Sequence, residues 1–367
     1  MRTELRALTG ARGLAAWFVV LYHIRLSIAG LPQAALDILA KGYLAVDFFF
    51  LLSGFVIWLT WHERLRAQGI AGIGPFLRKR IARIWPLHIV VLAGAVALAL
   101  VFVATGRADP VDYPFGQLPL NILLVQNWGF TNRLAWNNPS WSISAELGAY
   151  LLFPLLMAMV DWRRMASPVL MVVAAAILVL LHMTMAAPTL GTDIPRYGLL
   201  RCLTEFATGT IVSALWLRWH AAQPMRAAIA ASTAGIALLG AWAAGAPETL
   251  MVPAACACLL LVLALTSAAK RNPLSSRPIH YLGEISYATY LGHFMLWVVF
   301  KLLFVSNADA VPPTLIALYL GLVLIASVTL YHLIERPAQR KLNRLPSRSR
   351  EGSGEGDRNM SAPTPLP

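Results

Sequence analysis

The sequence predicts an all-α protein that crosses the membrane about ten times, with both termini in the cytoplasm. Of its 367 residues, 58% are hydrophobic and only 13% are charged, and the mean hydropathy is +0.64. Soluble domains are about 45–50% apolar and about 25% charged. The basic residues, which give a net charge of +13, fall in short clusters between long apolar runs. This distribution is typical of membrane loops and argues against nucleic-acid binding.

The apolar runs are each close to the roughly 20 residues that a transmembrane helix needs. One further apolar piece, residues 118–125, is too short to cross, and we expect it to be re-entrant or interfacial. The expected spans are 12–29, 43–61, 84–105, 141–160, 167–186, 197–217, 226–245, 248–266, 282–305 and 313–334.

The charges of the connecting loops alternate along this series. Basic clusters precede the first span and follow every second span, whereas the other loops hold few basic residues. The positive-inside rule therefore predicts that the basic loops and both termini are cytoplasmic. These clusters lie at 2–6, 64–83, 163–164, 218–226, 270–277 and 336–344.

The chain divides into two expected parts. Residues 1–340 are predicted to form one transmembrane domain. Residues 341–367 are predicted to be a disordered cytoplasmic tail, because their end is rich in Pro, Ser, Gly and charge. The three cysteines have no disulfide or metal-site spacing; they are Cys202, Cys256 and Cys258.

The first span carries a histidine, His23, well inside its apolar run. Helical rise places His23 about 16 Å along the axis from Arg12. Ionisable groups inside spans are costly and indicate functional sites, although simple packing against a neighbouring helix is the alternative. Either Asp47 or Glu146 could orient the imidazole, and each could instead form a structural ion pair. The sequence does not choose between the two carboxylates.

A pair of arginines, Arg80 and Arg83, precedes the third span. Their i, i+3 spacing places them on one face of a helix. Guanidinium groups bind phosphate in bidentate fashion, and Arg12 is predicted to face the same side of the membrane. These three arginines therefore indicate a site for a phosphorylated ligand. The alternative is topogenic charge that contacts anionic lipid headgroups.

Two further residues are candidates for substrate contact. His293 lies inside the ninth span, in a tyrosine-rich context that favours helix packing. Trp141 borders the long outer loop together with Trp128 and Trp136, where an aromatic belt is the first interpretation and stacking on sugar rings is the second. No P-loop, dinucleotide turn, HExxH motif or nucleophile elbow is present, which argues against a nucleotide-driven pump.

Six sequence blocks, in order, make the chain resemble the acyltransferase-3 family of integral membrane acyltransferases. Arg12 and His23 match the family's arginine–ten residues–histidine motif, and Arg80 and Arg83 match its RxxR motif. Thr9 stands where members often carry an acidic residue. The other blocks are GYLAVDFFFLLSGFVI at 42–57, PSWSISAELGAYLLFP at 139–154 with Trp141 and Glu146, GEISYATYLGH at 283–293, and HLIERPAQR at 332–340.

The resemblance implies transfer of an acyl group, usually acetyl, from acyl-CoA to a hydroxyl of a carbohydrate acceptor, in the plasma membrane and without a metal. Arg12, Arg80 and Arg83 would hold the CoA phosphates. His23 would act as general base or carry the acyl group itself. Some relatives have an appended SGNH-type domain, for which no room follows residue 340. We therefore expect a stand-alone form, acting alone or with a separate extracytoplasmic partner.

Two other classes of protein compete with this prediction. In a transporter or flippase, intramembrane His and Glu residues would form a proton relay, but the paired halves with broken helices typical of transporters are not visible in the sequence. In a structural membrane protein, the same residues would only pack.

Overall fold

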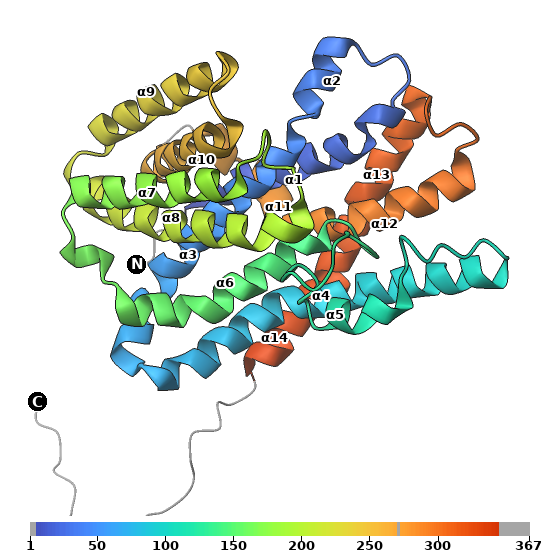
Figure 1. The fold of residues 1–367 in the computed structure, drawn as a ribbon, viewed down its shortest axis with the longest axis horizontal. Helices are drawn as coiled ribbons and strands as arrows, with labels where there is room; N and C mark the ends of the chain where they lie inside the picture. Colours follow the sequence, from blue (N-terminus) through green and yellow to red (C-terminus); the bar gives the residue numbers. More distant parts are fainter. Residues whose placement is uncertain (1–4, 270–271, 345–367) are drawn as a thin grey trace, which may run out of the picture.

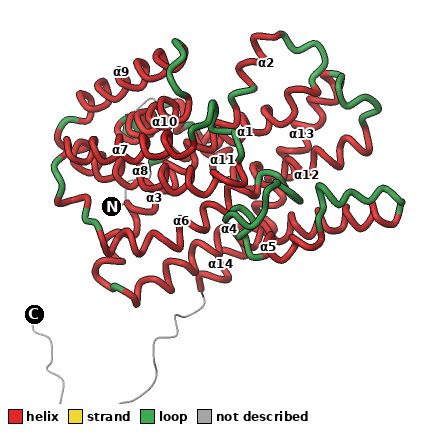
Figure 2. Tube along the Cα trace, in the orientation of Figure 1, coloured by secondary structure: helices red, strands yellow, loops and turns green. Residues whose placement is uncertain are grey.

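A computed structural model describes residues 5–269 and 272–344, and in these ranges the chain is mainly helical, with loops between the helices (Figure 2). Within them, nine helical stretches are long and apolar enough to cross a membrane. This confirms the prediction of an all-α, multi-pass membrane protein.

Ten long helices correspond one by one to the ten predicted spans. They are α1 (Arg6–Ile24), α3 (Ala45–Gln68), α4 (Ile70–Ala104), α6 (Ser140–Met159), α7 (Ser167–Met185), α8 (Ile194–Ala222), α9 (Pro224–Ala243), α10 (Glu248–Leu265), α12 (Ser286–Phe304) and α13 (Pro313–Leu330). In the described ranges, three short helices lie in the connections, α2 (Gln33–Leu39), α5 (Leu118–Ile122) and α11 (Arg277–Glu284), and α14 (Arg336–Arg344) follows α13.

Helix α8 is the long helix that is not among the nine stretches apolar enough to cross a membrane. Its 29 residues would extend about 43 Å, enough to cross a bilayer. Its charged residues Arg201 and Glu205 are buried, because α3, α6, α7 and α10 pack around the helix. The charged side chains of α8 therefore contact neighbouring helices and not the lipid.

Several helix boundaries differ from the sequence prediction, and two of them concern the arginine pair and the end of the predicted domain. Helix α4 begins at Ile70 and continues through Pro75 and Pro86, so the arginine pair lies within the helix. We predicted that the membrane-spanning run begins at residue 84, with the arginine pair on a helix face just before it. The helix is instead continuous, because packing of α4 against α6, α12 and α14 offsets the cost of proline in a helix interior. Helix α14 continues to Arg344, past the predicted domain end at residue 340. The remainder of the predicted tail, 345–367, lies outside the described residues.

Helices α3 and α8 are in backbone contact through two glycines. A Cβ atom on Gly54 would lie 2.0 Å from the carbonyl oxygen of Phe206, and one on Gly209 would lie 2.0 Å from that of Leu51. Only glycine permits such an approach. This contact fixes the register in which the charged residues of the two helices meet.

Helix α1 runs through the middle of the fold, between α3 and α10 on one side and α11 and α12 on the other (Figure 1). Its Gly13 lies against α11, where a Cβ atom would be 2.6 Å from the amide nitrogen of Gly283. A Cβ on Gly283 would in turn be 1.9 Å from the carbonyl oxygen of Thr9. These contacts bring Arg12 to the junction of α11 and α12.

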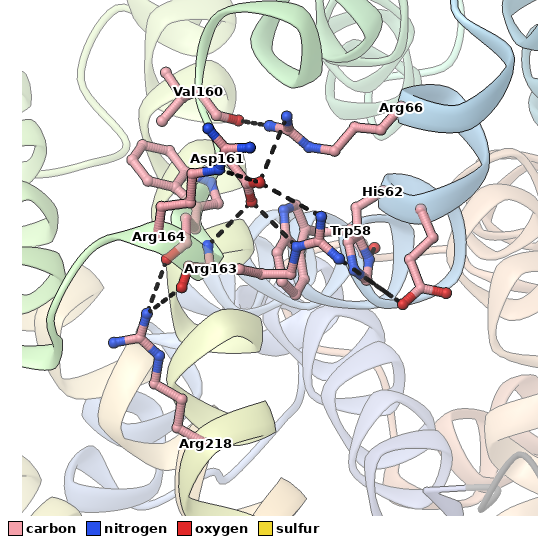
Figure 3. A network of polar contacts seen from close by, with 10 residues as sticks. Trp58, His62, Arg66, Val160, Asp161, Arg163, Arg164 and Arg218 are labelled. Carbon is pink, nitrogen blue, oxygen red and sulfur yellow. Dashed lines mark hydrogen bonds and ion pairs between the residues drawn. The ribbon is translucent and has the colours of Figure 1, made fainter.

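A charged network joins the ends of α3, α6 and α8 (Figure 3). Asp161 lies 3.2 Å from Arg163, 3.5 Å from Arg164 and 3.7 Å from Arg66. Arg218 donates to the backbone carbonyls of residues 162 and 163. Burial by itself would raise the pKa of Asp161, but hydrogen bonds from Arg163 and the charge of Arg66 lower that pKa below its ordinary value.

Candidate functional site

A cavity of about 430 Å³ lies between α1, α3, α4, α6 and α12. Its volume is within the range of about 300–1,000 Å³ that small-molecule sites occupy. Four of the residues that the sequence singled out line it: Arg12, Arg80, Arg83 and Glu146. Apolar and tyrosine side chains form much of the remaining wall. The structure thus brings the arginine pair and the first-helix arginine to one place.

Arg12 is oriented by the junction between α11 and α12. Its Nε donates to Ser286 Oγ at 2.9 Å, and its Nη2 donates to the Gly283 carbonyl oxygen at 2.6 Å. Ser286 also donates to that carbonyl, at 2.8 Å. The side chain is therefore held in one direction at the cavity wall.

The two arginines of the RxxR pair differ in their surroundings. Arg83 forms an ion pair with Glu335, and its guanidinium lies 5.4 Å from the centroid of the Tyr287 ring. Arg80 Nε is buried and has no hydrogen-bond partner within the described ranges. Buried donors are rarely left unsatisfied. Arg80 is thus the arginine with a donor available to an anionic ligand.

Glu146 lies at the cavity wall with two hydroxyl groups. Its Oε1 accepts hydrogen bonds from Ser53 Oγ and Tyr150 Oη, both at 2.5 Å. Tyr150 follows Glu146 by one helical turn, so the i, i+4 spacing could have indicated this contact. Nothing in the sequence indicates Ser53, which comes from α3.

His23 contacts a second histidine. Its Nδ1 lies 2.9 Å from the Val19 carbonyl oxygen and 3.1 Å from His293 Nε2. In the described part of the chain, neither Asp47 nor Glu146 contacts His23. The expected carboxylate partner is therefore replaced by an imidazole from α12.

The histidine pair lies one layer beyond the cavity, and neither ring lines it. Tyr290 connects the two places. Its ring centroid is 5.7 Å from that of Phe49, a cavity residue, and 6.3 Å from that of His293. Tyr290 Oη lies 2.8 Å from Ser142 Oγ. An aromatic layer thus separates the cavity from His23.

Asp47 has a different partner. It accepts two hydrogen bonds from Arg201, at 2.6 Å from Nε and 2.5 Å from Nη2. Both side chains are buried, and Glu205 lies 3.9 Å from the same guanidinium. This is the structural ion pair that we considered as the alternative for Asp47. Burial of a bidentate pair favours that interpretation, since breaking such a pair is costly.

Trp141 is packed in the interior with an exposed fraction of 5%. Its ring lies against Phe50, with centroids 5.9 Å apart, and 5.6 Å from the Arg201 guanidinium. The hollow beside it measures about 10 Å³, enough for about one water molecule. The ring face is therefore not open to a sugar in this conformation.

Among residues 5–269 and 272–344, no three His, Cys, Asp or Glu side chains gather as metal ligands.

Comparisons with known proteins agree with the motifs. The family model of an acyltransferase domain matches residues 5–332. Acyltransferase MdmB of Streptomyces mycarofaciens is 33% identical over 324 residues, which cover 80% of this chain and 79% of that protein. The putative membrane-bound transacylase BcsY of Komagataeibacter xylinus is 26% identical over 365 residues, 95% of this chain and 86% of that protein.

A more distant relative is O-acetyltransferase OatA of Staphylococcus aureus, 23% identical over 363 residues. That match covers 92% of this chain and 57% of OatA. No solved structure matches the chain.

Proposed function

Since the chain belongs to the acyltransferase-3 family, we propose that it transfers an acyl group, with acetyl as the first candidate, from acyl-CoA to a hydroxyl of a carbohydrate or glycosylated acceptor of the cell envelope. One observation supports this proposal most: a single cavity gathers Arg12, Arg80 and Arg83. Three guanidiniums that line one cavity match a ligand with several phosphates.

The charge balance of the cavity favours an anionic donor. Among residues 5–269 and 272–344, the carboxylates near Arg12, Arg80 and Arg83 are those of Glu146 and Glu335, which leaves an excess of positive charge. Guanidinium groups recognise phosphate through paired hydrogen bonds. The apolar walls of the cavity suit an uncharged pantetheine arm. On this proposal the CoA phosphates contact the arginines and the thioester points along the cavity toward Tyr290.

His23 is the proposed general base. The thioester would reach it past Phe49 and Tyr290. His23 Nε2 would take the proton of the acceptor hydroxyl while the hydroxyl oxygen bonds to the acyl carbon. The carbon–sulfur bond then breaks, and the proton passes to the CoA sulfur. Imidazole suits this role because its ordinary pKa is close to neutral pH.

The two carboxylates receive separate roles. Glu146 orients the hydroxyls of Ser53 and Tyr150 at the cavity wall. Asp47 neutralises Arg201 inside the bundle. The donor would enter from the cytoplasm, as the loop charges predict, and the acceptor from the other side.

Thioester consumption by the purified protein tests the proposal. Protein in nanodiscs would be incubated with acetyl-CoA and a panel of surface glycans. We expect release of free CoA thiol that depends on the glycan, with a matching mass increase of the glycan. A transporter would consume no thioester, and that result would overturn the proposal.

Replacement of both RxxR arginines tests the binding site. Arg80 and Arg83 changed together to Gln should raise the KM for acyl-CoA much more than the KM for acceptor. An unchanged KM for acyl-CoA would assign both residues to topogenic charge that does not bind the donor. Mass spectrometry of surface glycans from deletion and complemented strains would identify the acceptor.

A further inference from the structure

The pair formed by His23 and His293 has a hydrogen-bond pattern that determines where the protons lie. His293 Nδ1 is 3.0 Å from the carbonyl oxygen of Thr289. His23 Nδ1 is 2.9 Å from the carbonyl oxygen of Val19 and 3.1 Å from His293 Nε2. A carbonyl oxygen can only accept a hydrogen bond. Each of the two Nδ1 atoms must therefore carry a proton.

The protonation of the two Nε2 atoms, those of His293 and His23, follows from these assignments. Because His23 Nδ1 carries a proton and faces His293 Nε2, the latter must be the acceptor. His293 is then neutral, with its one proton directed to Thr289. Neutral imidazole has one protonated nitrogen, so a neutral His23 that is protonated at Nδ1 has its lone pair on Nε2.

His23 Nε2 has no partner in the described part of the chain. The ring is held on both sides by aromatic neighbours, with centroid distances of 5.1 Å to Tyr22 and 5.4 Å to Phe294. Tyr319 Oη donates to the backbone carbonyl oxygen of His293 at 2.9 Å and does not contact the imidazole. The pair thus presents one basic nitrogen on a ring that is fixed in orientation.

We propose that His293 is a positioning residue that, together with the Val19 carbonyl, holds His23 in the tautomer with a free Nε2. It fills the place of the carboxylate that usually orients a catalytic histidine. When His23 Nε2 takes the proton of the acceptor hydroxyl, the resulting imidazolium keeps an acceptor at Nδ1. The proton then passes to the CoA sulfur as the carbon–sulfur bond breaks. This inference rests on the proposed acyl transfer, and the contact between the two rings exists independently of it.

Two substitutions separate positioning from packing. In His293→Gln, the side-chain amide oxygen can occupy the place of Nε2 and accept from His23. In His293→Leu, a side chain of similar size offers no acceptor. We expect His293→Leu to lower kcat by about tenfold, because loss of one hydrogen bond costs about 1.4 kcal/mol. The KM for acyl-CoA should stay unchanged. His293→Gln should recover most of the rate. Equal rates for the two variants would overturn the inference.

A spectroscopic measurement gives a readout that does not depend on activity. The ¹⁵N resonances of labelled histidine in nanodiscs distinguish the two neutral tautomers, and His23→Gln identifies the His23 signal. We expect the Nδ1-protonated form in the wild type and in His293→Gln. In His293→Leu the Val19 carbonyl is the one acceptor left of the two, so we expect a measurable fraction of the Nε2-protonated tautomer. An unchanged tautomer in His293→Leu would overturn the inference.

The control is Tyr319→Phe, which removes a hydrogen bond to the same turn of α12 but leaves both imidazoles. His23 should keep the Nδ1-protonated tautomer in this variant. If it does not, the change of tautomer in His293→Leu would be explained by altered packing of α12. If the wild type consumes no thioester, the proposed function fails while the tautomer measurement still decides whether His293 orients His23.

Discussion

The substitution Arg80→Gln should weaken binding of acyl-CoA without destabilising the protein. Arg80 lines the cavity, and its buried Nε has no partner within the described ranges. A hydrogen bond between a charged guanidinium and a phosphate contributes about 1.5–3 kcal/mol. Its loss should therefore raise the Kd for CoA about ten- to a hundredfold. The thermal unfolding midpoint should stay close to that of the wild type, because no internal ion pair is removed.

The neighbouring arginine provides the contrast. Arg83→Gln removes the partner of Glu335, whose side chain is only 1% exposed. Leaving a buried charge unpaired costs about 3–5 kcal/mol, and the lower end applies because the Arg83 side chain is 25% exposed. We therefore expect Arg83→Gln to lower both CoA affinity and stability.

The assay is equilibrium binding of a non-hydrolysable acyl-CoA analogue to protein in nanodiscs, with thermal unfolding measured on the same samples. Arg107→Gln is the matched control, since it removes the same charge from an exposed loop position. A Kd for Arg80→Gln within twofold of this control would refute the assignment of Arg80 to the donor site.

Two further predictions concern stability. Gly54→Ala should destabilise the protein by about 1–3 kcal/mol, because its Cβ would lie 2.0 Å from the Phe206 carbonyl oxygen. The control Gly94→Ala should be neutral, because its Cβ would meet nothing within 4 Å. Equal unfolding midpoints for the two variants would contradict the tight α3–α8 contact. The pKa of Asp161 is lowered in the folded protein from its ordinary value of 3.8, so its charge stabilises the fold above that pH and the stabilisation is lost as the pH falls through the lowered pKa. Asp161→Asn should therefore be less stable than the wild type near neutral pH, and a difference that persists in strong acid would show that the charge is not the cause.

Much of the fold could be predicted from the sequence because a bilayer imposes simple constraints. A spanning helix needs a long apolar run, and each of the ten runs is a helix in the structure. The start of α4 at Ile70 was not predicted, because the basic residues before position 84 lie outside the apolar run, although the helix continues through them and through Pro75 and Pro86. Helix α8 was predicted as an apolar run at 197–217, although it buries Arg201 and Glu205 and is not among the stretches apolar enough to cross a membrane by composition.

The site was predictable in part. The arginines could be grouped because they share motifs and a predicted membrane face. Their partners could not be found, because those partners are distant in sequence: Glu335 is 252 residues from Arg83, and His293 is 270 residues from His23. Asp47 illustrates the same limit. Its depth in α3 allowed a contact with His23, but a guanidinium 154 residues away binds it instead.

The role of His23 is the central claim, and one measurement tests it directly. Purified wild type and His23→Ala would be compared for transfer of labelled acetyl from acetyl-CoA to the acceptor, after both are shown to be folded and to bind CoA equally. General-base catalysis contributes about 10²–10⁴-fold, so His23→Ala should lose at least about a hundredfold in kcat. Full acyl transfer by the intact variant would contradict the account.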